Sequence, residues 1–192
     1  MIKADQNKWD TLHAGLREED KPSVFLQLVF EQFGSILPPG KALDIACGRG
    51  RNSLFLAQRG FDVVAIDISP VALAEGRRRA AEKSLSISWR QADLEQIELP
   101  GTSYDLMVNF NYLQRSLIPQ IKKSLKSGGH VIFESYLIDQ RIIGHPKNPA
   151  YLLGHNELLD LFRGLRVLYY REGKFTEGGQ EAYRAGIFAQ KG

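Results

Sequence analysis

The chain has 192 residues, of which 43% are hydrophobic and 24% are charged, and its formal net charge is +3. This length and composition favour one folded domain and exclude a disordered, collagen-like or rod-like chain. The single cysteine excludes an intramolecular disulfide framework and a metal site built from several cysteines. No apolar run approaches the roughly 18 residues that a membrane span needs, and the start of the chain lacks the apolar core of a secretory signal. We therefore expect a soluble cytoplasmic protein with no membrane partner, and the small net charge does not by itself indicate a nucleic-acid partner.

Hydrophobic periodicity and turn residues predict strands that alternate with helices. Short runs rich in apolar and β-branched residues predict strands over Lys41–Ala46, Phe61–Asp67, Leu85–Gln91, Tyr104–Asn109 and Gly129–Tyr136. Segments with helical periodicity predict helices over Ser23–Ile36, Arg51–Arg59, Ser69–Lys83 and Leu113–Leu125. Ser69 is the expected N-cap of its helix, and Pro70 suits the first turn. Such an alternation is typical of βαβ units, in which a parallel sheet carries helices on both faces.

The last quarter of the chain has a different pattern. Gly144–Pro149 is too rich in proline to be a helix, and Glu157–Arg163 is predicted to be helical. Leu165–Arg171 and Ala182–Gln190 are predicted as two strands joined by the glycine-rich stretch Gly173–Gly179. This pattern indicates a hairpin that closes the edge of the sheet with an antiparallel strand.

The sharpest motif is a Gly-x-Gly turn, formed by Gly48 and Gly50, between a hydrophobic strand and a helix. In a doubly wound sheet such a turn lies at the carboxyl end of a strand, where ligands bind, and glycine lets the backbone approach a ligand closely. A tight turn with no ligand is the alternative interpretation. Ser53 stands where a dinucleotide fingerprint has its third glycine, which disfavours a nicotinamide cofactor.

Three acidic residues lie at the carboxyl ends of successive predicted strands. Asp44 lies just ahead of the glycine turn, where a carboxylate accepts hydrogen bonds from an ammonium group and repels a pyrophosphate. Asp67 ends the second strand, where an acidic side chain holds ribose hydroxyls. Asp93 follows the third strand and is expected near the exocyclic amine of adenine, with capping of the turn toward Glu95 as the alternative. A ligand with an amino group and a ribose but no phosphate fits S-adenosylmethionine better than NAD.

Around these residues the sequence resembles the class I S-adenosylmethionine-dependent methyltransferases. The segments similar to that family's motifs are Leu43–Gly50, Val63–Asp67, Gln91–Asp93, Tyr104–Val108 and Leu125–Val131. The glycine turn, the run from Asp67 to Pro70 and an arginine after a glycine-rich hairpin, Arg184, are closest to the tellurite-resistance-type branch. The hairpin of that branch carries a Leu-His-Arg element, whereas Gly173–Gly179 contains neither histidine nor arginine. This difference weakens the case for tellurium or selenium oxyanions as acceptors and leaves Arg184 as the candidate oxyanion contact.

The resemblance implies an α/β, Rossmann-like, seven-stranded and mostly parallel sheet in the order 3-2-1-4-5-7-6, with the last strand antiparallel and helices on both faces. It implies one domain over residues 1–192, with an N-terminal helical lid (1–36, including Trp9), a cofactor-binding core (37–136) and an acceptor cover with the C-terminal hairpin (137–192). The implied cofactor is S-adenosyl-L-methionine, and no metal is expected. The expected cofactor contacts are Asp44, Ala46, Gly48, Gly50, Asn52, Asp67, Ile68, Asp93, Leu94 and Asn109.

The methyl acceptor is expected beside the end of the fourth strand, at Asn109–Tyr112. The spacing of Asn and Tyr there matches the Asn-Pro-Pro-Tyr motif of amine-methylating nucleic-acid enzymes, but both prolines are missing. Methyl transfer to a nucleophilic acceptor depends on alignment and desolvation more than on acid–base groups. The weak catalytic candidates are therefore Tyr112, His145 and Arg184, and His155 is a further possible base.

We expect direct in-line methyl transfer to a small-molecule acceptor, which is a thiol, an oxyanion, a phenolate or an amine. The alternatives are an RNA or protein methyltransferase of the same fold and a non-catalytic S-adenosylmethionine-binding protein. The run Arg77–Arg79 is expected to be a solvated helix surface rather than an RNA contact. Little of the chain is left for acceptor recognition outside the cofactor fold, which favours a compact acceptor and makes nucleic acid an unfavoured partner. The sequence does not specify the oligomeric state.

Overall fold

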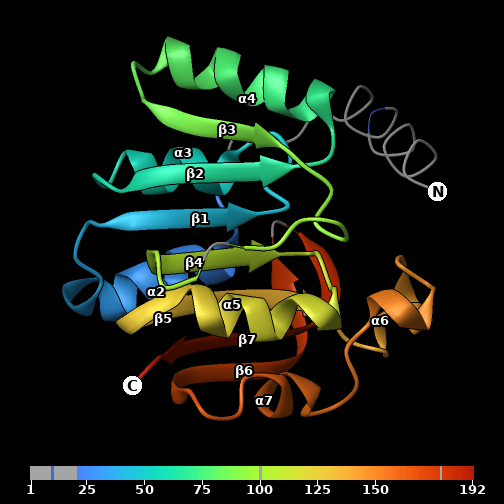
Figure 1. The fold of residues 1–192 in the computed structure, drawn as a ribbon. Helices are drawn as coiled ribbons and strands as arrows, with labels where there is room; N and C mark the ends of the chain where they lie inside the picture. Colours follow the sequence, from blue (N-terminus) through green and yellow to red (C-terminus); the bar gives the residue numbers. More distant parts are fainter. Residues whose placement is uncertain (1–9, 11–20, 100, 178) are drawn as a thin grey trace.

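A computed structural model describes Asp10 and residues 21–99, 101–177 and 179–192. Its strands form one seven-stranded sheet in the order β3-β2-β1-β4-β5-β7-β6 (Figure 1). The strands are β1 (Lys41–Ile45), β2 (Asp62–Asp67), β3 (Ile87–Gln91), β4 (Tyr104–Phe110), β5 (Leu125–Tyr136), β6 (Arg166–Glu177) and β7 (Gln180–Gln190). The pairs among β1 to β5 are parallel, whereas β7 is antiparallel to both β5 and β6. The predicted strand order and the antiparallel last strand are confirmed.

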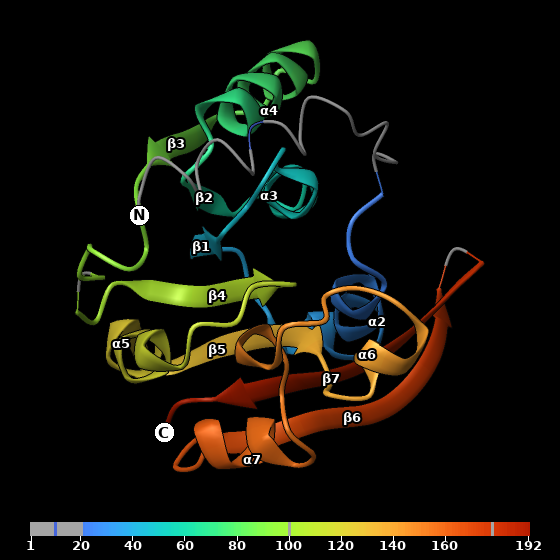
Figure 2. The same ribbon diagram turned by 90° about the vertical axis from the view of Figure 1, so that its right-hand side faces the viewer.

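Helices cover both faces of the sheet, as the alternation of apolar residues within the strands requires (Figure 2). The helices are α2 (Val24–Phe33), α3 (Arg51–Ala57), α4 (Pro70–Glu82), α5 (Ile118–Ser124), α6 (Gln140–Ile143) and α7 (Glu157–Leu161). Ala42 of β1 belongs to the apolar cluster that contains residues of α2 and α3. Its neighbour Leu43 points the other way, into the cluster that contains residues of α5 and α7.

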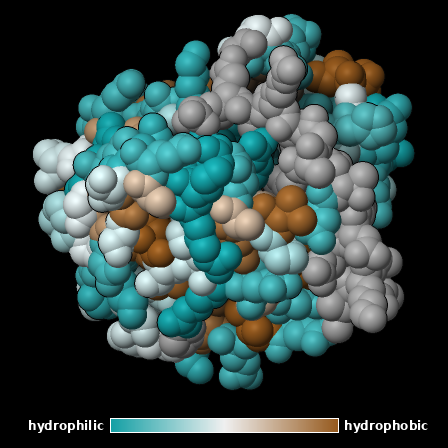
Figure 3. Space-filling view, turned by 90° about the horizontal axis from the view of Figure 1, so that it is seen from above, coloured by the Kyte–Doolittle hydropathy of each residue, from teal (hydrophilic) through white to brown (hydrophobic). Residues whose placement is uncertain are grey.

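The start of α4 shows how local sequence sets an element. The Ser69 hydroxyl accepts a hydrogen bond from the backbone N–H of Ala72 (3.1 Å), and Pro70 occupies the first turn, as predicted. The same hydroxyl donates to the carboxylate of Asp10, which brings this residue of the N-terminal segment to the end of β2. On α4 the arginine run is divided between environments, because Arg77 and Arg78 are exposed and Arg79 is buried. The surface above α4 and β3 is mainly hydrophilic with scattered apolar residues (Figure 3).

Three predicted elements have different bounds in the structure. The helix predicted over Leu113–Leu125 is reduced to a 3-10 turn and α5, because Pro119 has no N–H and fits only the first turn of a helix. The expected turn before the fifth strand is incorporated into β5, which begins at Leu125 and shifts register against β4. Most of Gly173–Gly179, predicted to be a loop, extends β6, because its backbone groups pair with β7 as far as Glu177.

No helix in the described ranges is long and apolar enough to cross a membrane. Of the lid predicted over residues 1–36, the structure describes Asp10 and the part from Lys21 onward. That part forms α2 and the 3-10 helix Gly34–Ile36. Trp9, the aromatic residue expected in the lid, lies outside the described residues.

Candidate active site

The carboxyl ends of β1, β2 and β3 are joined by backbone hydrogen bonds into one edge. The N–H of Cys47 donates to the carbonyl of Ile66 (3.0 Å), and the N–H of Gly48 donates to the carboxylate of Asp67 (2.7 Å). The N–H of Ala92 in turn donates to the carbonyl of Asp67 (3.0 Å). The predicted acidic positions after these strands are therefore brought to the same edge, where α/β sheets bind ligands.

The glycine turn has left-handed backbone conformations, with φ of 52° at Ala46, 54° at Gly48 and 78° at Gly50. A Cβ atom at Gly50 would lie 2.3 Å from the ring of Trp89 on β3, which is closer than any real contact. Gly50 is therefore required by packing as well as by its backbone conformation. The sequence predicted Gly50 as a turn residue and a cofactor contact but gave no sign of its packing on Trp89, and the cofactor contact stays a prediction.

Asp44 is a buried carboxylate that accepts a hydrogen bond from the Ser53 hydroxyl (2.6 Å). Burial raises the pKa of Asp44 from 3.8 to about 7, although the Ser53 bond lowers it, and the nearby charge of Asp67 raises it further. A cation bound beside Asp44 would favour its ionised form. Neighbouring groups therefore offset only part of the cost of a negative charge on Asp44, which lies where the amino group of a cofactor is expected.

Asp67 and Asp93 hold backbone N–H groups in the structure. Asp67 accepts from Gly48 (2.7 Å) with one carboxylate oxygen and from Ser69 (2.9 Å) with the other. Each carboxylate oxygen has a second lone pair, so hydroxyl donors can still bind there. Asp93 accepts from the N–H of Glu95 (2.9 Å), which is the capping contact that was the alternative interpretation of this residue.

Two predicted asparagines are buried and have local partners. The Asn52 amide bonds to both the backbone and the hydroxyl of Ser23 (2.9 and 3.3 Å), and so connects the start of α2 to the first turn of α3. Asn109 donates to the carbonyl of Tyr112 (2.7 Å), while its own amide oxygen is buried with no hydrogen-bond partner among the described residues. The remaining predicted contacts, Ile68 and Leu94, have carbonyls that accept from Gln91 and Gln114 (both 3.3 Å).

The structure places Tyr112 beside the turn that contains Asp93. Its hydroxyl bonds to the side chain of Gln114 (2.5 Å). Burial raises the pKa of Tyr112 well above its usual value, and the nearby charges of Glu95, Asp93 and Asp67 raise it further. Tyr112 is therefore a neutral phenol on the expected adenine side of the edge, and its role as a catalytic candidate stays a prediction.

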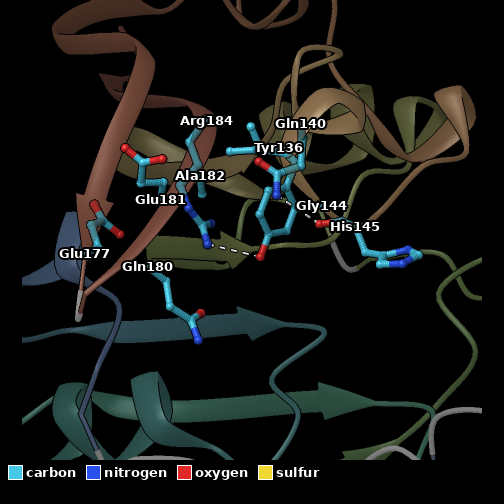
Figure 4. A pocket seen from close by; sticks show the side chains of 10 residues that line it. Tyr136, Gln140, Gly144, His145, Glu177, Gln180, Glu181, Ala182 and Arg184 are labelled. Atoms are coloured by element: carbon cyan, nitrogen blue, oxygen red, sulfur yellow. Dashed lines mark hydrogen bonds between the residues drawn. The ribbon is translucent and has the colours of Figure 1, made fainter.

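A pocket of about 500 Å³ lies beyond this edge, between the end of β5, the segment after it and the β6–β7 hairpin (Figure 4). The residues that line it are Tyr136, Gln140, Ile143, Gly144, His145, Glu177, Gln180, Glu181, Ala182 and Arg184. Two of the catalytic candidates, His145 and Arg184, are among them, whereas Tyr112 is not. Tyr136 was missed, although it ends a predicted strand just as Asp67 does. His155 lies outside the lining, exposed and paired with Asp139 (2.6 Å).

Arg184 connects this pocket to the sheet edge. Its guanidinium donates to the side chain of Asn111 (2.5 Å), which directly follows β4, and to the hydroxyl of Tyr136 (3.0 Å). The two groups from Arg184 and Tyr136 meet near the middle of the pocket in Figure 4. Because β4 pairs directly with both β1 and β5, the β1 and β5 strands lie about 10 Å apart, and the pocket begins at Tyr136, beyond the residue of β5 that is level with the end of β1.

The donors and acceptors at the edge fit S-adenosylmethionine. The acceptors Asp44 and Asp67 suit the ammonium and ribose hydroxyl donors of that molecule, and the raised pKa of Asp44 marks a position that a cation would stabilise. The left-handed backbone of Gly48 leaves no side chain on the inner side of the turn. A sheet of this order with such an edge defines a class I methyltransferase fold.

Comparisons with known proteins agree with this assignment. Residues 42–129 match the family model described as a methyltransferase domain. A probable S-adenosyl-L-methionine-dependent methyltransferase, TehB from Haemophilus influenzae, is 29% identical over 145 residues, which are 71% of this chain and 50% of that protein. The ubiquinone biosynthesis O-methyltransferase of Acinetobacter baumannii is 30% identical over 136 residues, 67% of this chain and 57% of that protein. Residues 42–129 therefore carry a methyltransferase domain, and the chain is similar to S-adenosylmethionine-dependent methyltransferases, TehB among them.

Solved structures show the same fold. The crystal structure of Haemophilus influenzae TehB has a TM-score of 0.74 at 22% identity, and the match covers 88% of this chain and 61% of that chain. The [4+2]-cyclase SpnF also has a TM-score of 0.74, at 17% identity, over 97% of this chain and 94% of that chain. Because a cyclase has the same fold as TehB, this fold accommodates different reactions, and the chemistry of a member follows from its site. The chain spans about half the length of the TehB sequence it matches.

Proposed function

We propose that this protein transfers a methyl group from S-adenosylmethionine to a small-molecule acceptor bound in the pocket beside β5. The observation that carries the proposal is the adjacency of two sites. An acidic edge centred on Asp44 and Asp67 suits a cationic nucleoside, and in a separate pocket Arg184 bonds to Asn111, which follows β4, the strand beside β1. A transferase needs such a pair of neighbouring sites, because donor and acceptor must be held in line.

The residues of the edge divide the work of holding the cofactor. Asp44 binds the ammonium group, and the backbone of Gly48 lies against the methionine part. Asp67 binds the ribose hydroxyls, and the Asp93–Leu94 turn borders the adenine. Gly50 shapes the turn through its packing on Trp89 rather than through a side-chain contact. The cofactor, when bound, supplies a methyl group on a positively charged sulfur. The sulfur is a good leaving group because it departs as a neutral thioether.

The remaining chemistry is alignment and exclusion of water. The cover, residues 137–192, contributes nine of the ten lining residues of the pocket, and this supports its proposed role as the acceptor cover. Gln140 stabilises this arrangement, because its side chain accepts from the N–H of Tyr183 on β7 (2.8 Å) and donates to the carbonyl of His145 (3.1 Å). A pocket of about 500 Å³ suits a compact acceptor.

The test is a titration of the purified protein with S-adenosylmethionine, S-adenosylhomocysteine and NADH by calorimetry. Binding of both sulfur nucleotides and not of NADH is expected, and absence of binding by the sulfur nucleotides would refute the proposal. Formation of S-adenosylhomocysteine is then measured with dithiothreitol, catechol, benzylamine, selenite and a short RNA as acceptors. Binding without turnover on any acceptor would instead support a non-catalytic or non-methylating role, as the fold of SpnF illustrates.

A further inference from the structure

Cationic and anionic side chains around the pocket form ion pairs with one another. Arg171 on β6 bonds to Glu134 on β5 and to Glu177 of the lining, both at 2.6 Å. Lys174 bonds to Glu181 at 2.8 Å. The guanidinium of Arg184 lies 3.6 Å from the second carboxylate oxygen of Glu134. The three cations and three carboxylates of this cluster, Arg171, Lys174, Arg184, Glu134, Glu177 and Glu181, therefore balance.

The register of the hairpin explains why Glu134 and Arg171 meet. Both residues pair with Gly186 of β7, one from each neighbouring strand. Because Gly186 has no side chain, the two groups reach each other across β7. A Cβ atom at Gly186 would lie 2.9 Å from the ring of Phe25, so the position is closed to larger residues. The pair is consequently fixed in place behind the pocket wall, in contact with the lining residues Glu177 and Arg184.

Arg184 is not available as an anion site in this arrangement. Glu134 is buried, with 1% of its surface exposed, so its carboxylate cannot turn away from the guanidinium into solvent. An anionic acceptor on Arg184 would add a negative charge beside Glu134, and its attraction to the guanidinium would be offset by repulsion from that buried carboxylate. The imidazole of His145, another lining residue, is exposed and points away from Arg184 and Tyr136 (Figure 4). The sequence-based prediction of Arg184 as an oxyanion contact is therefore not favoured by its surroundings.

Tyr136 is left as the central polar group of the wall. Its hydroxyl oxygen accepts from Arg184 (3.0 Å), and its ring packs under the guanidinium at 4.3 Å. Because the oxygen already accepts one hydrogen bond from a cation, its own hydrogen is directed elsewhere and can be donated to a lone pair. An acceptor atom that receives this bond keeps another lone pair for the methyl group.

We propose that the pocket takes an uncharged acceptor, an alcohol, phenol or thiol, whose reacting atom binds the hydroxyl of Tyr136. This inference rests on the proposed function and specifies its acceptor. The acceptor's oxygen or sulfur forms a bond to the methyl carbon as the bond from that carbon to the sulfonium breaks. The electron pair of the broken bond returns to the sulfonium sulfur, and the acceptor's proton passes to water.

The experiment uses fluorine NMR of three probes of similar size, each added to the full chain saturated with S-adenosylhomocysteine near neutral pH. The probes are para-fluorophenol (neutral), para-fluorobenzoate (anionic) and para-fluorobenzylamine (cationic). The neutral probe is expected to bind about tenfold more tightly than either charged probe, because an unpaired charge in a partly buried site is disfavoured. Tightest binding by either charged probe, or binding by none of the three, would overturn the inference.

Variants then test the residues. Tyr136→Phe keeps the ring that packs on Arg184 and is expected to weaken the phenol about fivefold or more, since one hydrogen bond is lost. Glu134→Gln removes one negative charge that neutralises an arginine, and it is expected to strengthen binding of the benzoate. Should that variant fail to fold, Glu177→Gln removes a negative charge from the same arginine and is expected to have the same effect. Unchanged phenol binding in the first variant, or unchanged benzoate binding in a folded Glu variant, would contradict the assignment. Failure of the wild type to bind S-adenosylhomocysteine would instead refute the proposed function.

Discussion

Replacing Asp44 with asparagine should stabilise the free protein and weaken cofactor binding. Asp44 has a pKa of about 7 in the folded chain, against 3.8 as its ordinary value. Its contribution to stability is therefore greatest at acidic pH and is lost as the pH rises toward 7, because the folded state then gives up a proton that it holds more tightly than the unfolded state does. Asparagine does not titrate, so Asp44→Asn removes this loss.

The magnitude follows from the two pKa values. A difference of about three pH units corresponds to roughly 4 kcal/mol at pH 8, and the part that develops between pH 5 and pH 8 is roughly 3 kcal/mol. Asparagine can still accept from the Ser53 hydroxyl, although a neutral acceptor makes a weaker bond. The free energy of unfolding of the variant should therefore exceed that of the wild type by more at pH 8 than at pH 5.

Urea denaturation of the free protein at the two pH values measures the stability difference, and calorimetry with S-adenosylhomocysteine at pH 8 measures binding. Binding should weaken by about 1.5–3 kcal/mol, the usual range for a hydrogen bond to a charged group. Asp105→Asn is the control. Partial burial raises the pKa of Asp105, but bonds from Lys126 and the Lys41 backbone lower it more, so this variant should lose stability.

Two results would refute the reasoning on Asp44. The first is a stability difference between Asp44→Asn and the wild type that stays constant from pH 5 to pH 8. The second is unchanged affinity for S-adenosylhomocysteine. In the wild type, cofactor affinity should also fall as the pH drops and Asp44 becomes protonated. The midpoint of that fall should lie below 7, because a bound cation favours the carboxylate.

Three further changes test other parts of the structure. Gly50→Ala should lower the free energy of unfolding by about 2 kcal/mol or more in urea, through overpacking on Trp89 and a strained φ, whereas Gly34→Ala, with no atom within 4 Å of its new Cβ, should change it little. Asp67→Ala should weaken S-adenosylhomocysteine by about 1–3 kcal/mol in calorimetry, and an unchanged affinity would exclude the ribose role. Arg115→Ala should destabilise the cover by about 1 kcal/mol, because Arg115 bonds to Glu157 (2.5 Å) and to the carbonyls of Ala150 and Leu152 (3.1 and 2.9 Å); unchanged hydrogen exchange in that segment would contradict this.

The sequence predicted that three acidic residues lie at one edge of the sheet because the signals for this are local. Asp44 and Asp67 lie at the carboxyl ends of strands that are recognisable from their own residues, Asp93 follows a third, and parallel strands bring these ends to one edge. The capping of α4 by Ser69 was likewise contained in a few neighbouring residues. The strand order was implied by resemblance to a known family, and the pairing of the strands confirmed it.

The pocket beside β5 could not be predicted in the same way, because its contacts join residues far apart in the chain. Glu134 and Arg171 meet only because the register of β7 places Gly186 between them. The sequence therefore predicted Arg184 as an anion contact, with no indication that a buried carboxylate lies beside it. Gly173–Gly179 was predicted as a loop from its glycines, whereas pairing with β7 makes most of it a strand.

The sequence by itself determined the alternation of strands and helices and the acidic residues at the carboxyl ends of the first three strands, because each depends on short-range periodicity and turn chemistry. Only the tertiary structure decided that Gly50 packs on Trp89, that Asp44 is buried enough for its pKa to reach about 7, and that the charges around the pocket cancel. Burial and charge pairing depend on which strands and helices lie side by side, and that is set by the packing of the whole chain.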